Sequence, residues 1–372
     1  MLTENITAPP EIFPFAKASL HHLANHPTDT VQPTSPFDHP DWDALVTSHP
    51  DFSFFHGSAW AKVLTETYGY APNYFVTKEA GKIRSLLPLM EVDSWLTGRR
   101  GIALPFTDDC EPLCPDKDSF QKLFHDAVEF GKTRGWRYLE CRVGRKFFDE
   151  VPAALSFYGH SLDLVPGEEK LFARLEGSVR RAIRKAEKDG VTVEISQGLE
   201  AMKIFYLLHC KTRKKHGLPP QPFAFFLNIH RHVLSQDLGM VAVASYRQTP
   251  IAASVYFHLG DRAIYKYGAS DEAFQHLRGS NLVMWGAIRR YLRRGAKKLH
   301  LGRTSIANEG LRRFKLGWGV EEEKIEYAKY DLHQKKFVTD SDKAFGWYNR
   351  VFQLLPGFAS RMAGNVLYRH WA

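Results

Sequence analysis

The chain has 372 residues, of which 44% are hydrophobic and 13% aromatic, so it holds enough apolar material for a large core, and its length favours two domains. Its 50 lysines and arginines outnumber 41 acidic residues, giving a formal charge of +9. That balance favours polyanions such as nucleic acid, nucleotide phosphates or anionic lipid, but a merely basic surface is an equal alternative. Four scattered cysteines exclude a disulfide scaffold, and Cys110 and Cys114 lack the second ligand pair of a zinc site.

The first 36 residues are rich in Pro, His and Thr and show little hydrophobic periodicity. This composition predicts a flexible leader over 1–36 and does not fit a secretory signal. No segment approaches the roughly 20 apolar residues that are needed to span a bilayer. We therefore expect a cytoplasmic protein whose ordered part begins near Phe37.

The segment 37–166 combines amphipathic helices with short apolar strands. Trp60, Leu64 and Tyr68 recur every four residues, which is typical of a helix. Helices are predicted over 58–68 and 119–134, and strands over 73–78, 83–92 and 137–143.

The segment 167–335 repeats this order of elements. Helices are predicted over 169–189, 199–216, 223–235 and 280–294, and strands over 191–195, 240–246, 251–258, 263–268 and 298–302. We therefore predict an α/β (α+β) protein with two similar lobes that divide near 164–167. Residues 336–372 would form a helical tail, either packed on the second lobe or lying as an amphipathic helix on a membrane.

The predicted helix 169–189 carries a dense basic cluster. Arg180, Arg184 and Lys188 share one stripe, with Arg181 and Lys185 beside it. Phosphate is a suitable partner because guanidinium groups match its oxygens, although a solvated basic face is the simpler alternative.

A possible anion-binding loop follows the strand that ends at Gly268-Ala269-Ser270. Gly279 and Ser280 open the next helix, where backbone N–H groups can hold an anion. Ser280 or Asn281 could instead cap this helix as part of an ordinary surface loop.

The strand 298–302 runs into a Gly302-Arg303 corner, and a lone lysine, Lys315, follows among apolar and glycine residues. Such a lysine could stabilise an oxyanion, or could simply lie on a turn with its stem against apolar neighbours. In the first half, Asp108, Asp109 and Cys110 follow the rigid corner Leu104-Pro105-Phe106. An aspartate there could bind an amine, a cysteine nucleophile would need a nearby base, and a local turn is the alternative.

These motifs, in this order, resemble the FemAB family of aminoacyl transferases, and more narrowly the FemAB-like proteins associated with exosortase systems. The supporting stretches are 178–190, Ile251–His258, Asn281–Gly286, Leu301-Gly302-Arg303, Phe314-Lys315 with Trp318-Gly319, and, in the first lobe, Pro88-Leu89 and Leu104-Pro105-Phe106. The resemblance implies two GNAT-like lobes, each with a mixed, mostly antiparallel sheet flanked by helices. It covers roughly 40–370.

The resemblance implies transfer of an acyl or aminoacyl group to an amine of a cell-envelope or polysaccharide precursor, such as a peptidoglycan intermediate. The donor would be acyl-CoA or aminoacyl-tRNA, and no cofactor would be tightly bound. One departure concerns the donor, because the helical-hairpin arm that some members insert for tRNA is not evident. Another is His300, which stands where the family usually has an aspartate.

The resemblance also assigns roles to residues of this sequence. Catalysis would fall to Lys315 with Phe314 beside it, and Asp108, Asp109 and Tyr267 would bind the acceptor. The candidates for binding donor phosphates are Arg303, Arg180, Arg184, Lys185, Gly279 and Asn281. The main alternative is a non-catalytic binder of anionic glycan or lipid intermediates in an envelope export pathway. Peripheral contact of the tail with an anionic inner membrane is a further expectation.

Overall fold

The computed structural model describes residues 30–371 apart from 109, 143–146, 149–150 and 341–347. In this part of the chain, fourteen strands form one sheet with the order β1-β2-β3-β4-β5-β13-β6-β11-β10-β9-β8-β7, while β12 pairs with β6 and β14 with β13. Only the β4–β5 and β10–β11 pairs are parallel among these strands. The predicted α/β class with mostly antiparallel pairing is therefore confirmed.

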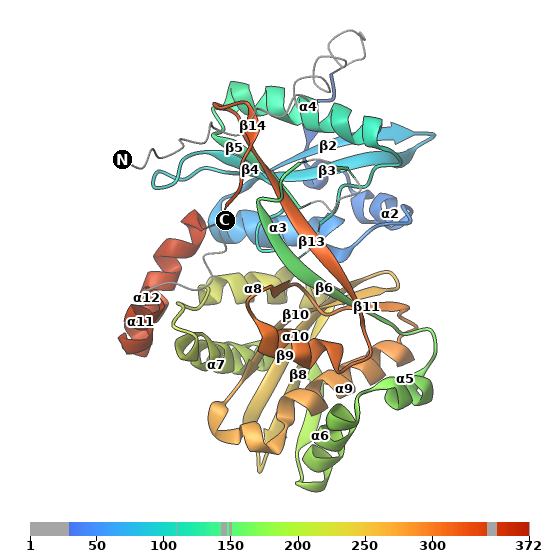
Figure 1. Ribbon diagram of the computed structural model, residues 1–372, viewed down its shortest axis with the longest axis vertical. Coiled ribbons are helices and arrows are strands. Elements are labelled where there is room, and N and C mark those ends of the chain that lie inside the picture. Colours follow the sequence, from blue (N-terminus) through green and yellow to red (C-terminus); the bar gives the residue numbers. More distant parts are fainter. Residues whose placement is uncertain (1–29, 109, 143–146, 149–150, 341–347, 372) are drawn as a thin grey trace, which may run out of the picture.

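The first half of the chain builds most of the upper part of the molecule in Figure 1, and its last strand, β6, runs down into the lower part. Its strands are β1 (Pro33–Thr34), β2 (Ala71–Glu79), β3 (Lys82–Val92), β4 (Arg100–Ile102), β5 (Tyr138–Cys141) and β6 (Leu155–Asp163). Its helices are α2 (Trp42–Thr47), α3 (Ser58–Tyr68) and α4 (Lys117–Arg134), and α4 and α3 lie on opposite faces of the sheet. The pairing of β1 with β2 includes Pro33 and Thr34 in the sheet, so order begins before the expected Phe37.

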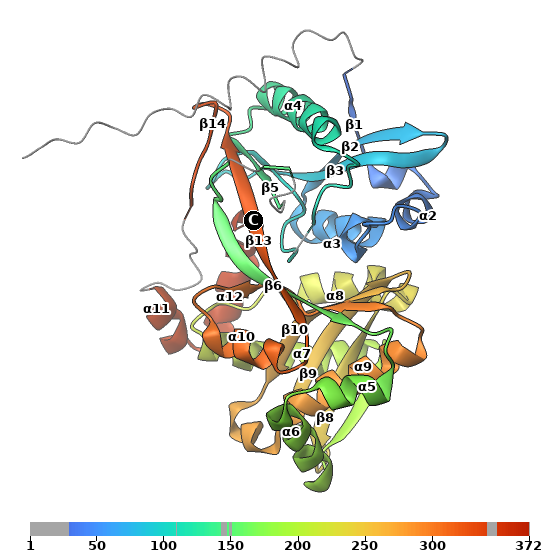
Figure 2. The ribbon, with the colours of Figure 1, turned by 45° about the vertical axis from the view of Figure 1, so that its right-hand side comes forward.

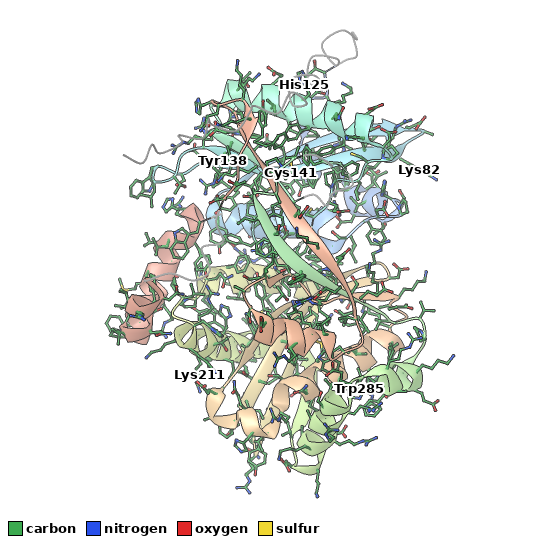
Figure 3. All side chains as sticks on the ribbon, viewed as in Figure 1. Lys82, His125, Tyr138, Cys141, Lys211 and Trp285 are labelled. Carbon is green, nitrogen blue, oxygen red and sulfur yellow. The ribbon has the colours of Figure 1, made fainter. Side chains whose placement is uncertain are left out.

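The second half contributes strands β7 (Thr192–Ser196), β8 (Gly239–Tyr246), β9 (Thr249–Leu259), β10 (Arg262–Ser270), β11 (Lys298–His300), β12 (Thr304–Ser305), β13 (Glu321–Asp331) and β14 (Lys336–Phe337). Its helices are α5 (Glu168–Arg174), α6 (Gly177–Lys188), α7 (Leu199–Lys215), α8 (Phe223–His232), α9 (Gly279–Arg293), α10 (Glu309–Leu316), α11 (Tyr348–Leu354) and α12 (Gly357–Leu367). Trp285 of α9, labelled in Figure 3, packs on Phe172 of α5 with ring centroids 5.1 Å apart.

The long strand β13 joins the two halves. Its first part, Glu321–Tyr327, pairs with β6, and its last part, Ala328–Asp331, pairs with β5. Figure 2 shows this strand running from the lower half into the upper one. One core cluster also combines residues of α3 with residues of α7, α8 and β8–β10. The halves therefore share both a sheet and a core, and the space between them is held in a fixed geometry.

The predicted single helix over 169–189 is wrong in one respect: the structure divides it into α5 and α6 at Leu175–Glu176. Leu175 is buried, and the backbone N–H of Glu176 donates to the carbonyl of Gly317 over 3.0 Å. This long-range bond competes with the helical hydrogen bond at that position. Leu171, Leu175, Val179 and Ile183 recur every four residues across both helices and are buried in one core cluster.

The tail helix α12 packs tightly on the loop before α8. A Cβ added to Gly364 would lie 2.0 Å from the carbonyl oxygen of Pro220. Beyond the helix, the Arg213 guanidinium donates to the Tyr368 hydroxyl over 2.7 Å, and the Tyr70 hydroxyl donates to the carbonyl of Arg369 over 3.0 Å. The end of the tail therefore contacts both halves. Among the described residues, no helix has the length and apolarity that a membrane crossing requires.

Candidate active site

The parallel strands β10 and β11 part where the sheet meets the junction between the halves. Their pairing ends at Ile264–His300, and the register of β10 shifts between Tyr265 and Tyr267. Just beyond, the chain turns at Gly302, which has a φ of +71°. Beyond this point β10 and β11 no longer pair with each other, although each remains in the sheet through its other neighbour, so space for a ligand can open between their ends.

The predicted anion-binding loop forms a small cavity of about 280 Å³ at the start of α9, which we call the donor cavity. Gly279 and Asn281 both line it, together with Gln275, Arg278 and Phe314. A Cβ on Gly279 would lie 2.9 Å from the Ile251 side chain, so glycine keeps this space open. The first-turn N–H groups of a helix lack intrahelical acceptors and attract anions.

The predicted cap of α9 is wrong. The residue that precedes the helix is Arg278, in the left-handed conformation with a φ of +58°, and no side chain caps the helix. The side chains proposed as caps, Ser280 and Asn281, line the donor cavity instead. This leaves polar groups at the helix start for a ligand.

Lys315 lies in the last turn of the helix α10, so the alternative of a lysine on a turn does not hold. Only 2% of the side chain is exposed. Its Nζ donates to the carbonyl of Gly302 over 2.8 Å and to that of Arg303 over 3.0 Å. Burial lowers the pKa of Lys315 to about 7, an effect that the nearby Asp108 carboxylate opposes. Its neighbour Phe314 lines the donor cavity, so α10 links that cavity to the strand corner.

Asp108 brings the first half of the chain into the site. Its carboxylate pairs with the ammonium of Lys266 at 2.7 Å, and it accepts a hydrogen bond from the backbone N–H of Arg303 over 3.4 Å. Burial acts to raise the pKa of Asp108, but the Lys266 charge holds it below its usual value. The carboxylate is therefore ionised. Asp109, the other predicted acid, lies outside the described residues.

Arg303 joins this cluster and not the donor cavity. Its guanidinium donates to the Tyr327 hydroxyl over 2.6 Å and lies 4.3 Å from the centre of the Phe157 ring. The Tyr327 hydroxyl in turn donates to the carbonyl of Asp108 over 2.9 Å. Arg303, predicted to bind donor phosphates, is not among the residues that line the donor cavity, and its contacts lie at the junction of the halves. We call the set Asp108, Lys266, His300, Arg303, Lys315 and Tyr327 the junction cluster.

His300 is neutral in this cluster, because burial lowers its pKa to about 4. Its Nδ1 accepts the backbone N–H of Gly302 over 3.0 Å. The ring proton must then be on Nε2, which is buried and has no hydrogen-bond partner among the described residues. The site therefore presents a neutral N–H donor at the position where the family resemblance leads us to expect an aspartate, which would present an acceptor.

The basic side chains of α6 contact residues that are not members of the junction cluster. Arg180 donates to the carbonyl of Ala173 over 2.7 Å, Arg184 lies over the Phe172 ring, and Lys185 pairs with Asp189 at 2.5 Å. These partners belong to α5 and to the residue that follows α6. The structure gives no direct contact between these side chains and the described residues that line the donor cavity.

Two further predicted residues lie beside the junction: Tyr267 is partly buried and Cys110 is buried. The Lys266 ammonium lies 5.0 Å from the centre of the Tyr267 ring, and the Tyr267 hydroxyl has no partner among the described residues. Cys110 has a histidine, His56, at 3.8 Å. However, His56 Nε2 also lies 2.8 Å from the carbonyl of Glu111, and its Nδ1 accepts from the backbone N–H of Ser53. His56 is therefore not placed as a base for this thiol.

Three important residues were not identified from the sequence. Lys266 carried a signal, since a lysine inside a strand with buried neighbours is rarely left without an ion partner. Tyr327 carried none, because an aromatic residue in a strand is ordinary. His160 is fully buried with its Nε2 3.0 Å from Glu322, and its position on β6 became clear only from the sheet pairing.

Comparisons with known proteins identify relatives of this fold. Residues 173–325 match the family model described as an acetyltransferase (GNAT) domain. The crystal structure of FemX is similar at a TM-score of 0.65, with 16% identity over 81% of this chain and 97% of that chain. The C-terminal domain of a putative lysylphosphatidylglycerol synthetase from Agrobacterium fabrum is similar at 0.53, with 16% identity over 82% of this chain and 93% of that chain.

A tandem GNAT protein from the clavulanic acid biosynthesis pathway is also similar, at a TM-score of 0.50 and 10% identity over 81% of this chain and 97% of that chain. No curated protein matches the sequence. The second half of the chain therefore matches the acetyltransferase (GNAT) domain model over 173–325. The chain as a whole shares its fold with FemX and with the tandem GNAT protein.

Proposed function

We propose that the protein is an N-acyltransferase that moves an acyl or aminoacyl group from an activated donor to an amine of a cell-envelope or polysaccharide precursor. The observation that carries this proposal is the placement of two neighbouring residues of α10. Phe314 lines the donor cavity at the start of α9, while Lys315 reaches the corner where β11 ends. A donor held by its phosphates at α9 would have its carbonyl directed toward the junction cluster.

The chemistry requires that the amine nitrogen attack the donor carbonyl. A C–N bond forms, the bond to the leaving sulfur or oxygen breaks, the amine loses a proton and the leaving group gains one. The tetrahedral intermediate carries an oxyanion, which a buried donor stabilises strongly. Lys315 has three N–H donors and uses two on backbone carbonyls, so one is left for the oxyanion. Asp108, held by Lys266, supplies the negative charge that would attract the acceptor amine, with Tyr267 beside it.

We propose an acyl thioester such as an acyl-CoA as the donor. The matching family is described as acetyltransferases, and the similar tandem GNAT protein is described in a form without AcCoA, which is a thioester of this kind. The donor cavity is lined by Arg278 and the start of a helix, which suits a pyrophosphate. An aminoacyl-tRNA donor is the alternative, for which the net charge of +9 and the basic face of α6 are the supporting observations.

A donor-binding assay tests this proposal. We expect CoA esters to raise the melting temperature of the wild-type protein, and Gly279→Val to abolish the shift because its side chain would fill the donor cavity. Asn281→Ala, which adds no bulk, should weaken the shift and confirms the site if Gly279→Val does not fold. Release of free CoA thiol in the presence of amine acceptors then reports transfer. Stabilisation by anionic glycans or lipids alone, without thiol release from any ester, would instead favour the non-catalytic binder.

A further inference from the structure

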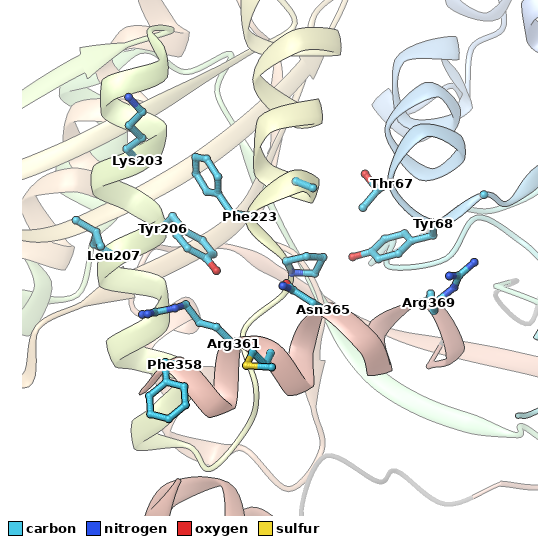
Figure 4. Close-up of a pocket in the computed structure, with 14 residues that line it drawn as sticks. Thr67, Tyr68, Lys203, Tyr206, Leu207, Phe223, Phe358, Arg361, Asn365 and Arg369 are labelled. Carbon is cyan, nitrogen blue, oxygen red and sulfur yellow. The ribbon is translucent and has the colours of Figure 1, made fainter. Parts of the chain in front are cut away.

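A second and larger cavity lies outside the junction cluster. It has a volume of about 1050 Å³ and lies between the end of α3, helix α7, the start of α8 and the tail helix α12 (Figure 4). Ligand cavities typically enclose roughly 300–1,000 Å³, so this space suits a large molecule. The tight approach of Gly364 to Pro220 keeps α12 in place as one wall. The cavity therefore depends on the tail.

The wall of this cavity is apolar and aromatic, and its charged members are all basic. Tyr206, Phe223 and Met362 supply apolar surface, and Lys203, Arg361 and Arg369 supply the charge. Lys203 pairs with Glu200 at 2.7 Å, whereas no carboxylate in the described part of the chain pairs with either arginine. The lining thus matches a ligand that joins an apolar chain to an anionic group.

Tyr68 provides a separate sign of a ligand. Only 6% of this residue is exposed, and its hydroxyl has no hydrogen-bond partner among the described residues. Figure 4 shows the ring extending from the end of α3 with its hydroxyl directed into the space between α3, α8 and α12. A buried hydroxyl without a partner is costly, so a polar group of a bound molecule would relieve that cost.

The tail presents an unusual apolar edge beside the cavity. Leu354, Phe358, Met362 and Val366 follow one another at steps of four residues and are 86%, 62%, 65% and 59% exposed. Phe358 and Met362 also line the cavity, and Leu207 of α7, 63% exposed, lies on the opposite wall. Large apolar side chains that gather at the rim of a basic cavity are typical of a surface that rests on a lipid bilayer.

We propose that this cavity takes one anionic phospholipid from a bilayer on which the edge of α11 and α12 rests. The phosphate would lie near Arg361, and an ester or headgroup oxygen would accept a hydrogen bond from the Tyr68 hydroxyl. An acyl chain would lie against Tyr206 and Phe223, and Arg369 would add positive charge at the other end of the cavity (Figure 4). The membrane contact expected of the tail is thereby given a residue-level site with a defined ligand. The inference does not depend on acyl transfer, because binding is measured without a donor.

Vesicle sedimentation with the full chain tests the membrane contact. We expect binding to vesicles of phosphatidylglycerol and phosphatidylcholine, and little binding to phosphatidylcholine alone. Arg361→Gln should weaken binding about fivefold, as expected for the loss of one cation at an anionic surface. Arg247→Gln, at an exposed turn between β8 and β9, removes the same charge elsewhere and should have little effect. Phe358→Ser should also weaken binding. Equal losses in Arg361→Gln and Arg247→Gln would overturn the proposal in favour of general electrostatic attraction.

A soluble short-chain phosphatidylglycerol, below its micellar concentration, tests the cavity itself. Calorimetry should show one molecule bound per chain, and inorganic phosphate should not compete at equal concentration. Ala224 lines the cavity, so Ala224→Trp should abolish binding by filling it, while Ala224→Ser should bind as wild type. Tyr68→Phe should weaken binding by removing only the hydroxyl. Binding that survives Ala224→Trp, or binding of phosphate alone with the same affinity, would refute a lipid site. Failure of both lipid assays would overturn the proposal and leave a protein partner as the occupant of the edge.

Discussion

Replacing Lys315 by methionine tests the central role that we assign in the junction cluster. Methionine keeps an unbranched apolar stem but removes the ammonium that donates to the carbonyls of Gly302 and Arg303. Loss of one oxyanion donor typically lowers kcat by about 10²–10³, or roughly 2.7–4 kcal/mol of transition-state stabilisation. We expect a loss of this size for Lys315→Met with an unchanged KM for the donor, because the donor phosphates bind elsewhere.

The same variant should remain folded. Bringing the pKa of Lys315 from 10.5 to about 7 reflects a cost of burying its charge, roughly 5 kcal/mol at most. The substitution removes that cost together with two hydrogen bonds to a charged group, each worth roughly 1.5–3 kcal/mol. These opposing effects are of similar size, so the free energy of unfolding at pH 6 should change by no more than about 2 kcal/mol. Urea denaturation measures this directly.

The pH dependence of turnover gives an independent test. The oxyanion role needs protonated Lys315, whose pKa is lowered to about 7, so kcat should fall as the pH rises through about 7. In the window between about 7 and 10.5 the unfolded chain holds this proton and the folded chain releases it, so this group's contribution to stability rises with pH there. Thiol-release assays from about pH 5.5 to about pH 9 should show the alkaline fall in wild type and in Lys298→Met, an exposed lysine on β11. Wild-type turnover in Lys315→Met, or an alkaline fall that survives in it, would refute the assignment.

Two further variants test how the halves are joined. Asp108→Asn should lower the free energy of unfolding by roughly 3–5 kcal/mol, because it leaves the Lys266 ammonium buried without its carboxylate. Urea titration should show that stability recovers in the double variant with Lys266→Met. An unaltered urea midpoint in the single variant would contradict the ion pair. Gly364→Val should displace α12, since a Cβ would lie 2.0 Å from the Pro220 carbonyl. Limited proteolysis should then release the tail while the rest of the chain resists, and a protected tail would contradict the close contact.

Much of the fold was predictable because local patterns determine it. The periodicity of Trp60, Leu64 and Tyr68 located α3 with the bounds that the structure shows. The strands predicted over 240–246, 251–258 and 263–268 fall within β8, β9 and β10. The break between α5 and α6 was missed because it depends on the backbone hydrogen bond from Glu176 to Gly317, which lies far along the chain. Periodicity carries no information on such a contact.

The site was predictable only in its separate parts. The donor loop and Lys315 lie near one another in the chain and could be recognised by motif, but Asp108 meets Lys266 across 158 residues. This ion pair forms because β13 and β6 bind the two halves into one sheet and bring the Asp108 loop against β10. Neither strand carries a sequence signal for that role.

The junction cluster explains why a histidine can stand where the resembling family has an aspartate. Asp108 already supplies one ionised carboxylate among three basic side chains, Lys266, Arg303 and Lys315. Neutral His300 adds no second negative charge to offset them, and its Nδ1 accepts the Gly302 N–H at the strand corner. Histidine in place of aspartate therefore supplies the Nε2–H donor instead of a carboxylate acceptor. The net charge of the cluster is then more positive than it would be with aspartate. A positive cluster of this kind favours an oxyanion, which is the charge that amide formation creates.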